Sequence, residues 1–224
     1  MGRPPDGGPD RRGRVSAAFG EPVATYRGST DPDAPLVVLL HGRGSDEQQI
    51  AALADHLPQQ LAYAAVRAPI AEGGGYAWFA NRGIGRPVAS SLAETTAWFR
   101  AWLDAEHAGR DVLLVGFSGG AAFAGGLLLA EPARWAGAAI LLGTLPFDAG
   151  VPTGPGRLSG VPVLVAQGDA DTVIPRELLD RTWTYLHDES GATLTAHRDP
   201  GGHGISAGTL AVLTAWLTAT AREH

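Results

Sequence analysis

Short runs of aliphatic residues recur along the chain and alternate with longer stretches in which polar and apolar residues are mixed. The run "LVVLLH" at 36–41 is an example, because only its last residue is polar. Runs of this kind are typical of strands that are buried on both faces of a parallel sheet. The pattern predicts strands at 36–41, 61–68, 111–117, 135–143 and 161–168, and a last strand near 192–197.

The stretches between these runs have helical character. We expect helices at about 46–57, 91–107, 119–131, 175–188 and 205–220. Strands that alternate with helices favour a parallel sheet covered on both faces. Between the strands that end near 143 and begin near 161, the segment "TLPFDAGVPTGPGRLSG" has room for a loop but not for a helical cap. The expected fold is α/β, with a mostly parallel central sheet, helices on both faces and no large cap domain.

The domain organisation is expected to be simple, because 224 residues without a repeat are ordinary for one compact domain. Residues 1–20 are rich in Arg, Pro and Gly and lack the apolar stretch of a signal peptide. We interpret them as a flexible leader that precedes a single domain at 21–224. No segment approaches ~20 uninterrupted apolar residues, so we expect no membrane span and a cytoplasmic location.

The composition excludes several kinds of binding site and several nucleophiles. A formal net charge of -6 provides no basic surface for nucleic acid. The chain has no cysteine, which excludes disulfides, thiolate metal sites and a cysteine nucleophile. All 17 basic residues are arginine, which excludes a Schiff-base lysine, a Ser-Lys dyad and the lysine of a phosphate-binding loop. The nucleophiles that remain are Ser, Thr, Tyr, His and the carboxylates.

Ser118 lies in "GFSGG" at 116–120, where a predicted strand meets a predicted helix. This fits the pattern G-x-S-x-G in the context that gives it meaning, a sharp turn that exposes the serine above the carboxyl edge of the sheet. Unpaired N–H groups at the start of the helix favour a developing oxyanion there. The pattern by itself is common, and a serine at this point can also be a simple helix N-cap. A catalytic serine needs a base and an acid, so the presence of these two residues distinguishes the two interpretations.

His203 is the candidate base, since glycines on both sides in "DPGGHGIS" free its loop to reach over the sheet edge. The other histidines are less suited. His56, His107 and His187 fall on predicted helices, His197 on a predicted strand, His224 at the chain end, and His41 in "LHGRGS" at a strand end, where a backbone-shaping role is expected.

The acid that orients the histidine has three candidates. Asp171 lies just past the strand at 161–168, where its side chain can reach back across the sheet edge. Asp169 is close enough to that strand to be a turn former, and Asp199 can instead steady the histidine loop. We prefer Asp171, which completes the chain order Ser, Asp, His that is known for α/β-hydrolases.

Four ordered segments, "LLHGRGSDEQ", "GFSGGA", "GDADTVIP" and "GGHGIS", resemble the phospholipase/carboxylesterase family of α/β-hydrolases, which includes the acyl-protein thioesterases. The similarity extends from about residue 34 to the C-terminus. It implies an α/β-hydrolase fold with Ser118 as nucleophile, Asp171 as acid and His203 as base. It also implies an oxyanion hole made by the backbone N–H groups of Arg43 and Gly119. Many relatives carry glutamine at the position of Gly119, so this chain keeps the backbone donor but lacks that side chain.

The segment "APIAEGGGYAWFANRGIGRP" at 68–87 is the expected wall of the substrate pocket, since a long loop at the active edge often carries function. Its aromatic residues Tyr76, Trp78 and Phe79 are the candidate substrate-binding residues. The alternative for Trp78 is that it packs the loop onto the body of the protein. Arg43 and Arg86 either attract an anionic substrate or form ordinary surface ion pairs.

The function predicted from these residues is a serine carboxylic-ester hydrolase that acts through an acyl-enzyme on short acyl or aromatic esters, with thioesters as the alternative substrates. The mechanism requires no metal and no organic cofactor. The expected partners are a small-molecule ester and, in a homodimer, a second copy of the chain, without nucleic acid. An acyltransferase or a ligand-binding protein on the same fold is the alternative.

Overall fold

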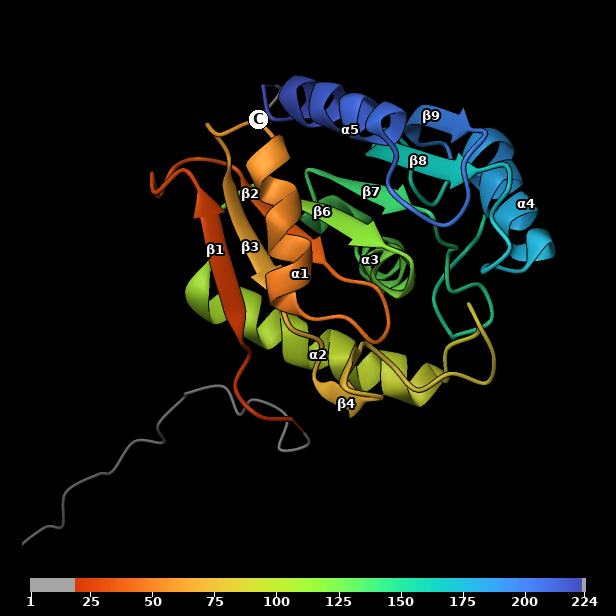
Figure 1. The fold of residues 1–224 in the computed structure, drawn as a ribbon, viewed down its shortest axis with the longest axis horizontal. Helices are drawn as coiled ribbons and strands as arrows, with labels where there is room; N and C mark the ends of the chain where they lie inside the picture. Colours follow the sequence, from red (N-terminus) through yellow and green to blue (C-terminus); the bar gives the residue numbers. More distant parts are fainter. Residues whose placement is uncertain (1–18, 223–224) are drawn as a thin grey trace, which may run out of the picture.

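A seven-stranded sheet organises the computed structural model, which describes residues 19–222 (Figure 1). The strand order is β1-β3-β2-β6-β7-β8-β9. Strand β1 runs antiparallel to β3, and every other neighbouring pair is parallel. The strands are β1 (Ala24–Gly28), β2 (Leu36–Leu40), β3 (Ala62–Val66), β6 (Val112–Phe117), β7 (Gly137–Leu141), β8 (Pro162–Gly168) and β9 (Thr193–Asp199).

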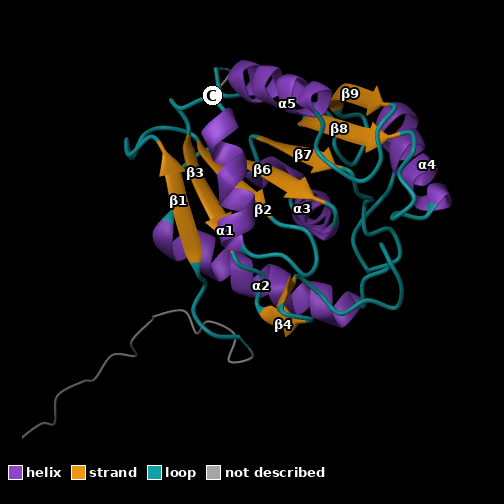
Figure 2. Ribbon diagram, in the orientation of Figure 1, coloured by secondary structure: helices purple, strands orange, loops and turns teal. Residues whose placement is uncertain are grey.

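Helices cover both faces of this sheet, as Figure 2 shows. One face carries α2 (Ala89–Glu106) and α3 (Gly119–Ala130), and the other carries α1 (Glu47–Ala51), the 3-10 helix η1 (Ala52–His56) and α5 (Ala207–Thr220). The remaining helices are the short η2 (Pro132–Arg134) and α4 (Arg176–Thr184), which continues into the π-helical turn η3 (Tyr185–Glu189). The predicted α/β architecture is confirmed.

The central strands bury side chains on both faces, which explains why their sequences lack alternation. In β2, Leu36, Val38 and Leu40 belong to the core under α2 and α3. Val37 and Leu39 belong to the core under α1 and α5. All of them are 0% exposed. Full burial of a large aliphatic side chain stabilises the folded state by about 1.5–3 kcal/mol. The central strands are therefore stably packed where their carboxyl ends support the site.

Strand β1 was not predicted, and two further segments differ from the prediction in detail. The segment 68–87, expected to be a loop, contains the hairpin of β4 (Ile70–Glu72) and β5 (Gly75–Ala77). The helix expected at 46–57 is divided into α1 and the tighter η1. Between β7 and β8 there are turns but no helix and no strand, so the expected absence of a cap is confirmed for this segment.

Residues 1–18 of the predicted leader lie outside the described residues. Its last two residues do not behave as a leader, because Phe19 packs edge-on against Trp98 and the indole N–H of Trp98 donates to the Gly20 carbonyl at 2.8 Å. The structure therefore places Phe19 and Gly20 against the body of the domain. Within residues 19–222, no helix combines the length and the apolar character needed to cross a membrane.

Candidate active site

Ser118 occupies the sharp turn between β6 and α3. Its backbone has φ 55° and ψ -114°, a positive φ that few residues with a side chain adopt. Its N–H donates to the Leu141 carbonyl of the neighbouring strand at 2.9 Å, which fixes the turn to the sheet. The side-chain oxygen makes no capping bond to the helix that follows, so it is not engaged as an N-cap.

The glycines beside Ser118 are required by space. A Cβ at Gly116 would lie 2.2 Å from the Gly120 carbonyl oxygen, and a Cβ at Gly120 would lie 2.1 Å from the Leu40 carbonyl oxygen. Both distances are far inside van der Waals contact. The motif therefore lets the start of α3 approach β6 and β2 closely, and this approach produces the turn that presents Ser118.

His203 reaches Ser118 from the loop between β9 and α5. Its Nε2 lies 2.9 Å from the Ser118 Oγ, and its Nδ1 lies 2.8 Å from the Asp171 Oδ2. A carboxylate only accepts hydrogen bonds, so the ring proton belongs on Nδ1 and Nε2 is free to accept the serine proton. The ring of Phe117 packs beside the imidazole at a centroid distance of 5.3 Å and limits its movement.

Asp171 is the aspartate that contacts the histidine. Its side chain is 0% exposed, and its second oxygen, Oδ1, accepts from the backbone N–H groups of Val173 at 2.8 Å and Ile174 at 3.2 Å. Asp169, the alternative on the same loop, is exposed to solvent. The structure brings together the three residues preferred from the sequence and leaves Asp169 outside the cluster.

Asp199 stabilises the loop that carries His203, which was its alternative role in the sequence analysis. Its carboxylate accepts from the Gly201 N–H at 2.7 Å, from the Ser206 hydroxyl and from the Thr209 hydroxyl at 3.1 Å. The hydrogen bond from Ser206, followed by that from Gly201, lowers the pKa of the Asp199 carboxyl. Because Gly201 and Ser206 flank His203, this carboxylate closes the loop that carries the base.

The backbone N–H groups of Arg43 and Gly119 are the candidate oxyanion donors. A Cβ built on Gly119 would lie 3.2 Å from the backbone nitrogen of Arg43, so the two amides are close neighbours. Among the described residues, neither N–H donates to a protein acceptor. Gly119 is also the first residue of α3, where the helix dipole favours negative charge. This arrangement suits an oxyanion hole.

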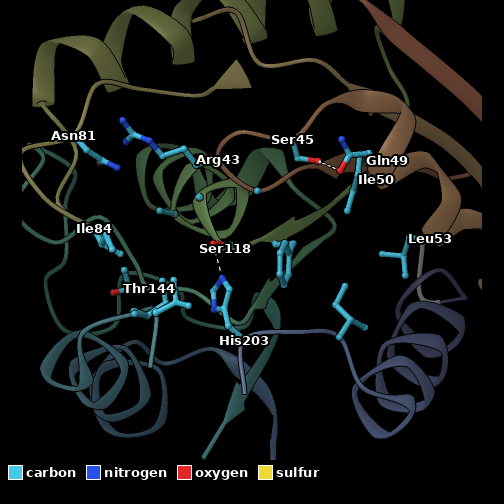
Figure 3. A pocket seen from close by; sticks show the side chains of 18 of the residues that line it. Arg43, Ser45, Gln49, Ile50, Leu53, Asn81, Ile84, Ser118, Thr144 and His203 are labelled. Carbon is cyan, nitrogen blue, oxygen red and sulfur yellow. Dashed lines mark hydrogen bonds between the residues drawn. The ribbon is translucent and has the colours of Figure 1, made fainter. Parts of the chain in front are cut away.

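The side chains of Arg43 and Arg86 form ordinary surface ion pairs, which was the alternative to attraction of an anionic substrate. The Arg43 guanidinium donates to Glu72 from Nε at 2.7 Å, and Arg86 pairs with Glu177 at 3.0 Å. Both pairs are well exposed, so each contributes little to stability. In Figure 3 the Arg43 side chain extends away from Ser118. Within residues 19–222, no group of three or more His, Asp or Glu side chains is placed to hold a metal ion.

Ser118 and His203 open into a pocket of about 780 Å³. As Figure 3 shows, Ile84 and Thr144 lie to one side of the Ser118–His203 pair, and Ile50 and Leu53 lie to the other. The volume falls in the range of roughly 300–1,000 Å³ that is usual for small-molecule sites. The pocket therefore extends in both directions from the nucleophile, with apolar side chains in each arm.

The family to which the chain belongs follows from comparison with known proteins. The model of the phospholipase/carboxylesterase family matches residues 24–220, most of the chain. The chain belongs to this family. It is accordingly an esterase-type hydrolase, and its sheet and helices have the arrangement of the α/β-hydrolase structures in the family.

Three proteins similar to this family member share 23–28% sequence identity with it. MhqD of Bacillus subtilis (strain 168), whose name assigns it provisionally as a hydrolase, is 27% identical over 177 residues, which are 76% of this chain and 86% of MhqD. A carboxylesterase from Mesorhizobium loti has 28% identity and a TM-score of 0.72, over 82% of this chain and 88% of the other. A Bacillus cereus carboxylesterase has 23% identity and a TM-score of 0.77, over 92% and 96%, and shows the shared fold.

The structure separates the three aromatic residues that were predicted to bind substrate. Phe79 lines the pocket. Trp78 does not, because it is 1% exposed, stacks on Phe123 at a centroid distance of 4.5 Å and donates from its indole N–H to the His41 carbonyl. Tyr76 also lies outside the lining, with its ring against Arg67. Adjacent residues of an extended segment point in opposite directions, so only part of this set could face the pocket.

Several lining residues were not anticipated. They come from three places, the α1–η1 region, the tip of the 81–87 loop and the loops after β7, β8 and β9. They include Gln49, Ile50, Leu53, Asn81, Ile84, Thr144, Val173, Ile174 and Ile205. Ile84 and Val173 stand out only in the structure, where they are apolar but 53% and 43% exposed. A sequence alone does not show which apolar residues stay in contact with water.

His41 has the backbone-shaping role that was expected. It is 0% exposed, its Nδ1 lies 2.7 Å from the Gly42 carbonyl oxygen, and its Nε2 accepts from the Ala68 N–H at 3.0 Å. Burial lowers the pKa of His41, which favours the neutral ring. The imidazole thus joins the ends of β2 and β3 beneath the oxyanion loop.

We expect Trp78→Ala to lower the free energy of unfolding by about 3–5 kcal/mol, because it removes a fully buried aromatic side chain and leaves a cavity. KM for small aromatic esters should stay close to the wild-type value, since the ring does not line the pocket. Urea denaturation and steady-state kinetics measure the two effects. Phe79→Ala is the matched comparison and should raise KM. A rise in KM for Trp78→Ala with unchanged stability would contradict the core assignment.

Proposed function

We propose that this chain is a serine carboxylic-ester hydrolase that acts on short acyl or aromatic esters through an acyl-enzyme intermediate. The observation that carries the proposal is the continuous hydrogen-bonded series Asp171–His203–Ser118 at the base of an apolar pocket. Membership of the phospholipase/carboxylesterase family supports the same reaction class. A cytoplasmic location and a homodimer remain parts of this proposal.

In the first half of the proposed reaction, the Ser118 Oγ attacks the ester carbonyl carbon while His203 Nε2 takes the hydroxyl proton. The carbonyl oxygen becomes negatively charged in the tetrahedral intermediate and accepts hydrogen bonds from the N–H groups of Arg43 and Gly119. Asp171 keeps the ring proton on Nδ1 and stabilises the imidazolium. His203 then gives the proton to the leaving alkoxide, the C–O bond breaks, and the acyl group remains on Ser118.

In the second half, His203 removes a proton from water, and the oxygen of that water attacks the acyl-enzyme. Collapse of the second intermediate returns the proton to Ser118 and releases the carboxylic acid. An alcohol in place of water would give a new ester, which is acyl transfer. A thioester follows the same steps with a thiol as leaving group, so the arrangement of groups suits both ester types.

The size of the pocket sets the expected substrate range. Ile84 and Val173 line the pocket and are exposed, so a substrate that covers them gains apolar burial. Each methylene that leaves water contributes about 0.8 kcal/mol, or about 4-fold in kcat/KM. No cap stands between β7 and β8 to enclose a long chain. The gain should therefore stop once the acyl chain extends beyond the pocket.

The test is a panel of p-nitrophenyl esters with acyl chains of about two to sixteen carbons, with matched acyl thioesters and an added alcohol acceptor. We expect turnover, a rise of kcat/KM over the shortest chains, and a plateau or fall beyond about eight carbons. Free acid should be the main product. A rise that continues to sixteen carbons would refute the short-chain preference, and a new ester as main product would indicate a transferase. Binding without turnover would refute the proposed reaction.

A further inference from the structure

The hairpin β4–β5 is bound to the loop at 42–45, which carries the Arg43 N–H. The Gly44 N–H donates to the Tyr76 carbonyl at 2.9 Å, and the Tyr76 N–H donates to the Ser45 carbonyl at 2.9 Å. Glu72, at the end of β4, accepts the hydrogen bond from the Arg43 side chain. Backbone bonds of Tyr76 therefore hold the two residues that follow Arg43, and the Glu72 side chain holds Arg43 itself.

Contact between the hairpin and this loop leaves no spare space at Gly75. A Cβ at this position would lie 2.0 Å from the Gly44 carbonyl oxygen and 2.3 Å from its carbonyl carbon. Gly75 is not among the glycines with positive φ, so alanine is excluded there by the neighbouring loop and not by its own backbone conformation. Any side chain at residue 75 must displace the Gly44–Ser45 peptide, which lies two peptide units along the chain from the Arg43 N–H.

The hairpin and the loop also share an anchor beneath them. Arg67, which follows β3, donates to both carboxylate oxygens of Glu47 at 2.6 Å, and the Glu47 side chain is 1% exposed. These bonds lower the pKa of Glu47, so its carboxylate stays charged. The same guanidinium lies 4.8 Å from the centroid of the Tyr76 ring. Glu47 starts α1 directly after the loop and its cap Asp46, so both sides of the loop are held.

We propose that the β4–β5 hairpin positions the Arg43 N–H for oxyanion stabilisation, with Gly75 as its positioning residue and Glu72 as a weaker second tie. This rests on the proposed function, in which that N–H is an oxyanion donor. A donor of this kind acts in the transition state and not on the bound ester, so its displacement lowers kcat and leaves KM largely unchanged. Within the described residues, neither Ser118 nor His203 forms a hydrogen bond with the hairpin, so both should keep their geometry.

The experiment compares Gly75→Ala with Gly73→Ala in the same hairpin. A Cβ at Gly73 meets no atom within 4 Å, although its φ of 59° makes alanine mildly strained there. Gly73→Ala therefore disturbs the hairpin turn without touching the 42–45 loop. We expect Gly75→Ala to lower kcat by about 10²-fold or more, the loss known for one oxyanion donor, with KM within about threefold. Gly73→Ala should retain kcat within about threefold of wild type.

A phenylboronic acid inhibitor supplies a readout that general destabilisation does not move, because its adduct with Ser118 places an oxygen in the oxyanion hole. Its Ki should rise for Gly75→Ala in proportion to the loss of kcat. If Gly75→Ala does not fold, Glu72→Gln at a partly exposed side chain is the second variant, with an expected loss of kcat of a few-fold and the same trend in Ki.

The proposal is overturned if folded Gly75→Ala keeps kcat within twofold, if only KM changes, or if Gly73→Ala loses as much as Gly75→Ala. When Gly75→Ala does not fold, unchanged kcat and Ki in Glu72→Gln overturn it. These outcomes differ from failure of the proposed function, which would appear as wild-type protein without esterase turnover.

Discussion

Replacement of Ser118 by alanine is expected to abolish ester hydrolysis, with a loss in kcat of about 10⁶-fold as for the nucleophile of other serine hydrolases. The reason is that Ser118 supplies the atom that forms the acyl-enzyme, and no other hydroxyl is placed on His203 Nε2 within the described residues. The alanine variant should fold, because the change removes one oxygen and leaves the glycine contacts of the turn intact. Turnover of p-nitrophenyl acetate, corrected for hydrolysis in buffer, measures the loss.

A fluorophosphonate probe tests the same residue without turnover. Wild-type protein should gain the mass of one probe, and Ser118→Ala should gain none. Ser45→Ala is the matched control, since this serine lines the same pocket but its hydroxyl is bound to Gln49 at 3.2 Å. It should gain the mass of one probe, like wild type. Labelling that persists in Ser118→Ala would show that another nucleophile carries the chemistry.

Replacement of Asp171 by asparagine is expected to lower kcat by about 10⁴-fold. The N–H groups of Val173 and Ile174 both point at Oδ1, so the amide oxygen of asparagine should take that position. Its NH₂ group would then face His203 Nδ1 and donate to it. The ring proton would move to Nε2, where it prevents acceptance of the serine proton. The fold should survive, because the backbone bonds to Oδ1 are kept.

Two neighbouring aspartates provide the controls for this prediction. Asp169→Asn should change kcat by less than about threefold, because Asp169 is exposed and outside the cluster. Asp199→Asn should have an intermediate effect, since it weakens the brace of the His203 loop without touching the ring proton. Steady-state kinetics of the three variants at pH 8 give the order. If Asp169→Asn loses more activity than Asp171→Asn, the acid has been assigned to the wrong residue.

The central strands and the cluster Ser118, Asp171 and His203 could be predicted because each depends on local pattern. Strands β2 and β6 are continuous aliphatic runs, and the three polar residues follow strand ends that topology brings to one edge of the sheet. Chain order and loop glycines then selected one histidine among seven. These signals need no knowledge of side-chain packing.

The elements that were missed depend on contacts between distant segments. Strand β1, "ATYRG", is short, partly polar and antiparallel at the sheet edge, so its sequence lacks the signal of the central strands. The strands of the β4–β5 hairpin are too short for periodicity to identify them, and the Gly73-Gly74 pair is equally typical of a loop. The choice between pocket and core for Trp78 depends on Phe123, a residue of α3 that packs against it. No local pattern contains that contact.

The backbone of Ser118 has a consequence for attempts to make this enzyme more heat-resistant. A residue with a side chain at a positive φ carries strain of order 1–3 kcal/mol, and glycine adopts such a conformation without it. A directed-evolution screen that scored only resistance to heat denaturation would thus favour glycine at position 118. It would enrich variants that are folded but lack the nucleophile. Variant libraries for this chain should be ranked by product formed after a heat step, with the turn at 116–120 left unmutated.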